Sequence, residues 1–149
     1  MKNKINGLSK LFKEKNINTK HKQNLYYLLA DVKNEIVKIE NEYEFFIWEN
    51  GTWEDGTWHN GKWLNGFWDN GYWKNGNWKN GNWKNGTWYY GTWYDGTWKN
   101  GNWEDGTWYN GKWLNGNWKK GFILNKYTNE LEYSNLSPDK VEWSYSYQK

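Results

Sequence analysis

The sequence predicts a mainly β protein whose central half is a solenoid built from short extended segments. Tryptophan occupies every fifth position from Trp48 to Trp118, fifteen times without interruption. Glycine keeps the same spacing from Gly51 to Gly121. The resulting Gly-x-Trp-x-Asn unit is too short for a helical repeat, so each unit must be a few extended residues and a corner. Aliphatic residues are scarce in this segment, so aromatic side chains must form the core.

Three regions follow from the change in composition along the chain. Residues 1–47 are predicted to form a small α/β cap or anchor, residues 48–121 the solenoid, and residues 122–149 a β cap. Because a solenoid leaves exposed strand edges at both ends, segments of different composition are expected to cover them.

The N-terminal region is predicted to contain one helix followed by one strand. Thr19 is a suitable N-cap for a helix from Lys20 to Glu35. Val37 to Trp48 alternates apolar and charged residues and is rich in β-branched and aromatic residues, which favours a strand. Apolar residues from Leu25 to Phe46 also follow a heptad spacing, so a coiled coil remains an alternative.

Each residue of the five-residue unit has a predicted role. The first and third residues, Gly and Trp, point inward, the second and fourth point outward, and the fifth turns the corner. Glycine beside each indole is expected to make room for the ring. The predicted core ladder comprises Trp53, Trp58, Trp63, Trp68, Trp73, Trp78, Trp83, Trp88, Trp93, Trp98, Trp103, Trp108, Trp113 and Trp118.

The corner position is Asn at ten of fifteen units and Asp at three. Both residues hydrogen-bond the nearby backbone in turns, and the following glycine tolerates positive φ. Buried indole N–H groups need acceptors. The Asn side chains and the corner carbonyl groups are the nearest candidates.

This pattern resembles the pentapeptide-repeat family, over Trp48 to Gly121, with Gly in place of the small residue and Trp in place of Leu or Phe. The resemblance implies a right-handed β-helix with about four units per coil. Residues twenty apart, such as Lys79 and Lys99, would then be neighbours on adjacent coils. With three units per coil, neighbours would be fifteen apart, which gives a mostly apolar outer column of Leu64, Lys79, Tyr94, Tyr109 and Leu124.

A second fold is compatible with the same spacing. Asn-Gly between two strand residues is a strong signal for a tight hairpin, so an antiparallel meander of Asn-Gly hairpins is the alternative. Such a meander would have very short strands and would leave the tryptophan face uncovered. The solenoid is therefore the preferred prediction.

After Gly121 the repeat ends, and Ile123 takes the position where tryptophan is due. The segments 122–124, 131–133 and 141–147 are predicted to be short strands, with Pro138 in a turn between the last two. Within the repeat, Glu54 to Gly66 recurs almost unchanged at Glu104 to Gly116, which indicates a fifty-residue duplication.

Composition restricts the possible functions. The net charge is +3, and all twenty cations are lysines, so specific nucleic-acid recognition by arginine is not expected. There is no cysteine, and His21 and His59 are the only histidines. The acidic pairs Glu54-Asp55 and Glu104-Asp105 are interpreted as solvated charge. No catalytic residue, metal site, cofactor site or small-molecule substrate is predicted, and the protein is not expected to be an enzyme.

The preferred functional prediction is a non-enzymatic structural or protein-interaction scaffold. Gly-Trp pentapeptides of this kind resemble those of bacteriophage-encoded proteins, which implies a virion or tail-associated component. The possible contacts with a protein partner or with further copies are Tyr72, Tyr89, Tyr94 and Tyr109. The expected location is the virion or the host cytoplasm, without a signal peptide and without a membrane.

Other functions remain open as alternatives. These are inhibition of a DNA-handling enzyme by a pentapeptide-repeat protein and glycan binding through exposed aromatic residues. Ice binding through the threonines of the second position is a minor further possibility.

Overall fold

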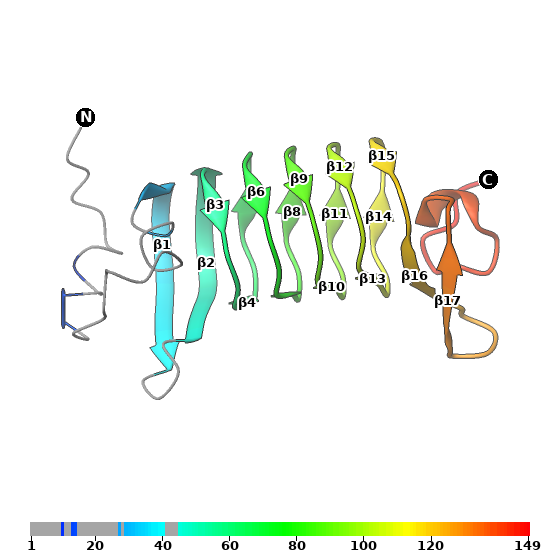
Figure 1. Ribbon diagram of the computed structural model, residues 1–149, viewed down its shortest axis with the longest axis horizontal. Helices are drawn as coiled ribbons and strands as arrows, with labels where there is room; N and C mark the ends of the chain where they lie inside the picture. Colours follow the sequence, from blue (N-terminus) through cyan, green and yellow to red (C-terminus); the bar gives the residue numbers. More distant parts are fainter. Residues whose placement is uncertain (1–9, 11–12, 15–26, 28, 41–44) are drawn as a thin grey trace.

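The computed structural model describes residues 10, 13–14, 27, 29–40 and 45–149. Within them the protein is a β-solenoid of about five turns, which confirms the predicted fold class and is consistent with a pentapeptide-repeat-like fold. Figure 1 shows the coils stacked side by side into a rod, with β1 (Asp31–Glu40) at one end and β17 (Leu131–Ser134) at the other.

Thirteen of the strands contain two residues each, the second and third residues of a unit. They follow the longer strand β2 (Phe45–Asp55). They are β3 (Thr57–Trp58), β4 (Lys62–Trp63), β5 (Phe67–Trp68), β6 (Tyr72–Trp73), β7 (Asn77–Trp78), β8 (Asn82–Trp83), β9 (Thr87–Trp88), β10 (Thr92–Trp93), β11 (Thr97–Trp98), β12 (Asn102–Trp103), β13 (Thr107–Trp108), β14 (Lys112–Trp113) and β15 (Asn117–Trp118).

The strands pair in parallel with a register of fifteen residues, so each coil contains three units. Trp63 pairs with Trp78, and Trp78 pairs with Trp93. This corrects the expectation of four units per coil. Each indole meets the next one along the chain edge to face, as between Trp78 and Trp83, whose ring centroids are 5.9 Å apart at 73°. Because an indole is larger than a leucine or phenyl side chain, three of them close the interior.

Parallel pairing also rules out the meander of Asn-Gly hairpins. In the solenoid each corner leads the chain to the next side of the coil instead of reversing it. The three sides, called here the first, second and third face, are the columns of strands stacked along the rod. The first face carries β4, β7, β10, β13 and β16, the second β5, β8, β11 and β14, and the third β3, β6, β9, β12 and β15.

The interior consists of three columns of stacked indoles. The first contains Trp48, Trp63, Trp78, Trp93 and Trp108, the second Trp53, Trp68, Trp83, Trp98 and Trp113, and the third Trp58, Trp73, Trp88, Trp103 and Trp118. Neighbouring rings within a column are almost parallel, as for Trp83 and Trp98 with centroids 4.7 Å apart at 6°. Fourteen of these side chains are buried, and only Trp118, in the last coil, is half-buried.

The glycines are required mainly by the backbone of the preceding coil. A Cβ added at Gly81 would lie 2.4 Å from the carbonyl oxygen of Gly66 and 3.2 Å from Nε1 of Trp63, and the φ of Gly81 is +130°. The expected reason, room for the indole, is therefore secondary. Absence of a side chain lets successive coils approach closely, and the positive φ turns the corner.

Two indole N–H groups of the repeat donate to corner carbonyl groups. Nε1 of Trp93 donates to the carbonyl oxygen of Asn110 at 3.1 Å, and Nε1 of Trp103 donates to that of Lys120 at 3.2 Å. Nε1 of Trp108 donates instead to Oγ of Ser146 in the C-terminal tail, at 2.8 Å. Ten other buried indole N–H groups have no hydrogen-bond partner among the described residues. Ring packing is therefore the main interaction that holds the columns together.

The N-terminal end of the rod is covered by an antiparallel strand. β1 pairs with β2 along both its first and second faces, and Lys33 and Lys38 form ion pairs with Glu54 and Glu49. Val37 to Trp48 was predicted as one strand, and its described residues are extended, so the coiled coil is wrong. The single strand is also wrong, because the segment is divided between β1 and β2, which pair antiparallel. Residues 31–35, expected at the end of the helix, belong to β1, and most of the remaining predicted helix lies outside the described residues.

Tyr27 and Ala30 close the first coil. The Tyr27 ring stacks on Phe46 with centroids 4.2 Å apart, and its hydroxyl donates to the carbonyl oxygen of Asn60 and accepts from the N–H of the same residue. Burial raises the pKa of the Tyr27 phenol, and its hydrogen bonds with the backbone of Asn60 and His59 act in the opposite direction. The hydroxyl thus satisfies backbone groups that have no preceding coil to bond.

The C-terminal end continues the first column and then changes direction. β16 (Gly121–Leu124) pairs in parallel with β13, so Ile123 stacks in register above Trp108. β17 then runs antiparallel to β16. Pro138–Lys140 is a 3₁₀ turn, as the lone proline indicated. The predicted strand at 141–147 is absent, and this segment has turns and a single bridge between Ser144 and Asn125.

Candidate interaction surfaces

The second and fourth residues of each unit form the outer surface of the rod. Because the register is fifteen residues, fourth-position side chains lie in three columns. The column after the first face is Glu49, Leu64, Lys79, Tyr94, Tyr109 and Leu124. The column after the second face is Glu54, Asp69, Lys84, Lys99 and Leu114. The column after the third face is His59, Lys74, Tyr89, Glu104 and Lys119.

Two of the four tyrosines expected to contact a partner lie in the first of these columns. The rings of Tyr94 and Tyr109 stack with centroids 5.1 Å apart at 11°. Nζ of Lys79 lies 3.9 Å from the centre of the Tyr94 ring, which is a cation–π contact. Beyond Glu49, this column forms a narrow aromatic strip of Leu64, Lys79, Tyr94, Tyr109 and Leu124 that runs along the rod.

The other two tyrosines lie on the third face. The rings of Tyr72 and Tyr89 are 6.2 Å apart at 29°, and Nζ of Lys74 lies 4.2 Å from the centre of the Tyr89 ring. The structure therefore separates the four residues into two pairs that one flat partner surface cannot cover together.

Within the repeat, sequence reasoning missed two exposed aromatic residues, Phe67 and Tyr90. Tyr90 occupies a fifth position, where Asn or Asp is the rule, and Phe67 occupies a second position, where Thr, Asn or Lys is common. Their departure from the consensus of the unit was the available signal. A large apolar side chain that interrupts a polar column has no role in the core and is free to contact a ligand.

Among the described residues, five corners have a hydrogen bond between the fifth residue of one unit and the glycine that begins the next. The backbone N–H of Gly96 donates to Oδ1 of Asp95 at 2.8 Å, and that of Gly61 donates to Oδ1 of Asn60 at 2.9 Å. The same bond is present at Asn50, Asp55 and Asp105. Asn and Asp are interchangeable here because each supplies a side-chain oxygen at the same distance from the backbone.

Replacement of Asp95 by alanine is expected to lower the free energy of unfolding by about 1 kcal/mol, because the Gly96 N–H loses its acceptor. Urea denaturation followed by fluorescence measures this change. Asp95→Asn is the matched control, since it keeps the oxygen, and its effect should stay within about 0.5 kcal/mol. Equal losses in both variants would contradict the role assigned to the acceptor.

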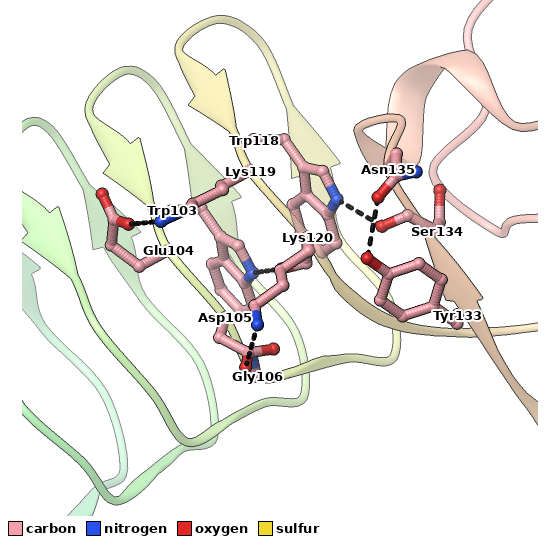
Figure 2. Close-up of polar contacts among 10 residues, drawn as sticks. All are labelled: Trp103, Glu104, Asp105, Gly106, Trp118, Lys119, Lys120, Tyr133, Ser134 and Asn135. Atoms are coloured by element: carbon pink, nitrogen blue, oxygen red, sulfur yellow. Dashed lines mark hydrogen bonds and ion pairs between the residues drawn. The ribbon is translucent and has the colours of Figure 1, made fainter.

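The two acidic pairs form exposed ion pairs and corner hydrogen bonds on the surface. Glu54 forms an ion pair with Lys33, and Asp55 accepts from the N–H of Gly56. Near the other end, Lys119 reaches Glu104 at 3.4 Å and Lys120 reaches Asp105 at 3.7 Å (Figure 2). The Lys119–Glu104 and Lys120–Asp105 pairs are exposed contacts between successive coils, and each makes a small contribution to stability. Figure 2 also shows Nε1 of Trp118 donating to the carbonyl oxygen of Ser134, which ties the last coil to the cap.

The described residues contain no group of three or more His, Asp or Glu side chains placed to hold a metal ion. In the same part of the chain, no helix combines the length and hydropathy needed to cross a bilayer. Comparisons with known proteins found nothing similar: no protein family, no curated protein and no solved structure matches the chain.

Proposed function

We propose that the protein is a non-enzymatic structural rod that binds a protein partner or further copies of itself within a larger assembly. The uninterrupted packing of three indole columns carries this proposal. Each central ring is fixed by two stacked and two edge-to-face neighbours, as Trp83 is by Trp68, Trp98, Trp78 and Trp88. Such close packing resists bending and suits a part that holds two other components at a fixed separation.

The internal duplication supports a function that depends on the length of the rod. The copied block is shifted by fifty residues, which is three coils of fifteen plus one unit of five, so it moves from one face to the next. Glu54 follows the second face, whereas Glu104 follows the third. Copying therefore lengthened the rod with an identical interior but did not repeat the outer pattern on one face. A regular ligand lattice such as ice would need that repetition.

The aromatic strip of Leu64, Lys79, Tyr94, Tyr109 and Leu124 is the proposed contact with the protein partner. Aromatic residues are enriched at the centres of interfaces, and the two stacked rings are already ordered, which limits the entropy lost on binding. The proposed setting is a bacteriophage virion or its tail. There the protein would be incorporated into particles or found in the host cytoplasm before assembly.

Duplex mimicry and tryptophan-mediated glycan binding have less support. A mimic of DNA should be acidic, whereas the outward positions carry lysines. Among them are Lys84 and Lys99, which are neighbours in the column after the second face. Glycan binding through indoles needs exposed rings, but those of the repeat are buried apart from Trp118.

The test is the distribution of the protein between assembled particles and soluble protein in its natural source. Particles purified by density-gradient sedimentation should contain the chain at a fixed ratio to the other components, measured by quantitative mass spectrometry. The variant Tyr94→Ala/Tyr109→Ala should fold but lose incorporation, whereas Tyr72→Ala/Tyr89→Ala, on another face, should be incorporated normally. Recovery only as a soluble monomer would refute the proposal.

A further inference from the structure

Shallow grooves run along the corners of the rod. One lies between the second and third faces, lined by Asn70, Asn85, Tyr72 and Thr87. Another lies between the third and first faces, lined by Asn60, Asn75, Tyr90 and Thr92. A third lies between the first and second faces, lined by Asp95, Asn110, Thr97 and Tyr145. Their volumes are 360, 260 and 380 Å³.

The three grooves are similar in composition. Each is lined by at least two corner Asn or Asp side chains, at least one threonine, two glycines and one tyrosine, and the third also contains Lys112. Tyr72, Tyr90 and Tyr145 are 51, 56 and 54% exposed, so more than half of each side chain is open to a ligand. These tyrosines come from a second position, a fifth position and the C-terminal tail. Each corner therefore has a tyrosine ring, although the three tyrosines occupy different positions in the repeat or the tail.

The polar groups of the first groove are arranged along the rod axis. Nδ2 of Asn70 donates to Oδ1 of Asp55 at 3.4 Å, one coil away. Asn70 and Asn85 occupy equivalent positions of successive coils, and the coils are separated by about 4.8 Å. Tyr89 lies against Tyr72 on the side of the fourth position, away from the corner. It can therefore support the Tyr72 ring from behind while the groove side remains open.

The chemistry of the grooves excludes several ligand classes. The first two are lined by no lysine, so they do not suit a phosphate backbone. Strands β6 and β9 beside the first groove are each paired on both sides, so no free edge is available to an added peptide strand. Carboxamides, which both donate and accept hydrogen bonds, together with hydroxyls and one aromatic ring, fit a neutral ligand rich in hydroxyl groups.

We propose that the first two corner grooves each bind an extended neutral glycan chain, with Tyr72 and Tyr90 stacking on sugar rings and corner Asn side chains bonding to hydroxyls. Each groove is lined by residues of successive coils, such as Asn70 and Asn85, so it extends along the rod and suits a polymer better than a small compact ligand. The site is independent of the aromatic strip, because Tyr94 and Tyr109 lie outside all three grooves. The rod would thereby attach to a polysaccharide as well as to its protein partner.

Isothermal titration calorimetry with cellohexaose tests the proposal on the full chain. The wild type should bind, and Tyr72→Ala/Tyr90→Ala should bind at least tenfold more weakly. The matched control Tyr94→Ala/Tyr109→Ala, which also removes two surface tyrosines, should bind like the wild type. Far-ultraviolet circular dichroism of each variant verifies the fold.

A second variant separates loss of binding from loss of structure. Asn70→Ala/Asn85→Ala leaves both rings in place and should weaken binding in the first groove, because its carboxamides are removed. The curved chain of maltohexaose should bind more weakly than cellohexaose to the wild type. Absence of cellohexaose binding, or equal affinity in the groove variants and the strip variant, would overturn the proposal.

Discussion

Replacement of Trp83 by alanine is expected to lower the free energy of unfolding by about 3–5 kcal/mol. The side chain is fully buried in the middle of the second column, between Trp68 and Trp98 at 4.8 and 4.7 Å. Its removal deletes ring contacts on all sides and leaves a cavity that the regular backbone of the neighbouring coils cannot fill. Urea denaturation, with the midpoint and slope compared with the wild type, measures the loss.

Phe67→Ala is the matched control for Trp83→Ala. It also removes an aromatic ring from the second face, but this ring is exposed and adds nothing to the indole columns. Its effect should stay within about 0.5 kcal/mol. If the two substitutions destabilised the protein equally, the indole columns would not be the source of stability.

Substitution of Gly81 by alanine is the second change with a large expected effect, about 3 kcal/mol or more. Two causes combine, since the φ of +130° is strained for any L side chain and the new Cβ would meet the Gly66 carbonyl oxygen at 2.4 Å. The coils would have to separate locally, which would also weaken the hydrogen bond from the N–H of Asn82 to that carbonyl. Denaturation in urea again gives the magnitude.

Asn80→Ala controls for the site of the substitution. Asn80 precedes Gly81 at the same corner and is exposed, so its replacement should change the free energy of unfolding by about 0.5 kcal/mol or less. A stable Gly81→Ala variant would mean that the coils are not in close backbone contact.

The sequence was sufficient for the architecture because every unit repeats the same physical constraints. The five-residue spacing of tryptophan and glycine specifies an inward ring and a corner at each unit, so the solenoid is independent of any single residue. The number of units per coil was not accessible in this way. It depends on the volume of the indole relative to leucine or phenylalanine and on the close approach of glycine backbones, which only the packed structure shows.

The ends and surfaces were harder to predict than the repeat. Residues 31–35 were predicted to end the helix, yet pairing with β2 places them in a strand, which is a tertiary effect. The grouping of the tyrosines depends on the number of units per coil. With three units per coil, Tyr94 and Tyr109 are neighbours, and Tyr72 lies on another face. Tyr145 joined a groove because the C-terminal tail folds back along the rod, and no spacing in the sequence indicates that.

Disulfide formation between engineered cysteines tests the three-unit coil most directly, because the chain has no cysteine of its own. Lys84, Lys99, Lys79 and Lys74 all occupy fourth positions, so pairs of them differ only in separation. Lys84→Cys/Lys99→Cys, fifteen apart, places the two Cα atoms about 4.8 Å apart, within the range that a disulfide spans. Lys79→Cys/Lys99→Cys, twenty apart, and Lys74→Cys/Lys84→Cys, ten apart, place them on different sides of the rod.

The three variants are oxidised in a glutathione buffer under native conditions, and intact mass gives the fraction cross-linked. The stacked indole columns predict rapid and nearly complete closure of the fifteen-residue pair and none of the other two. Closure of the twenty-residue pair in preference to the fifteen-residue pair would contradict the three-sided coil and every surface derived from it.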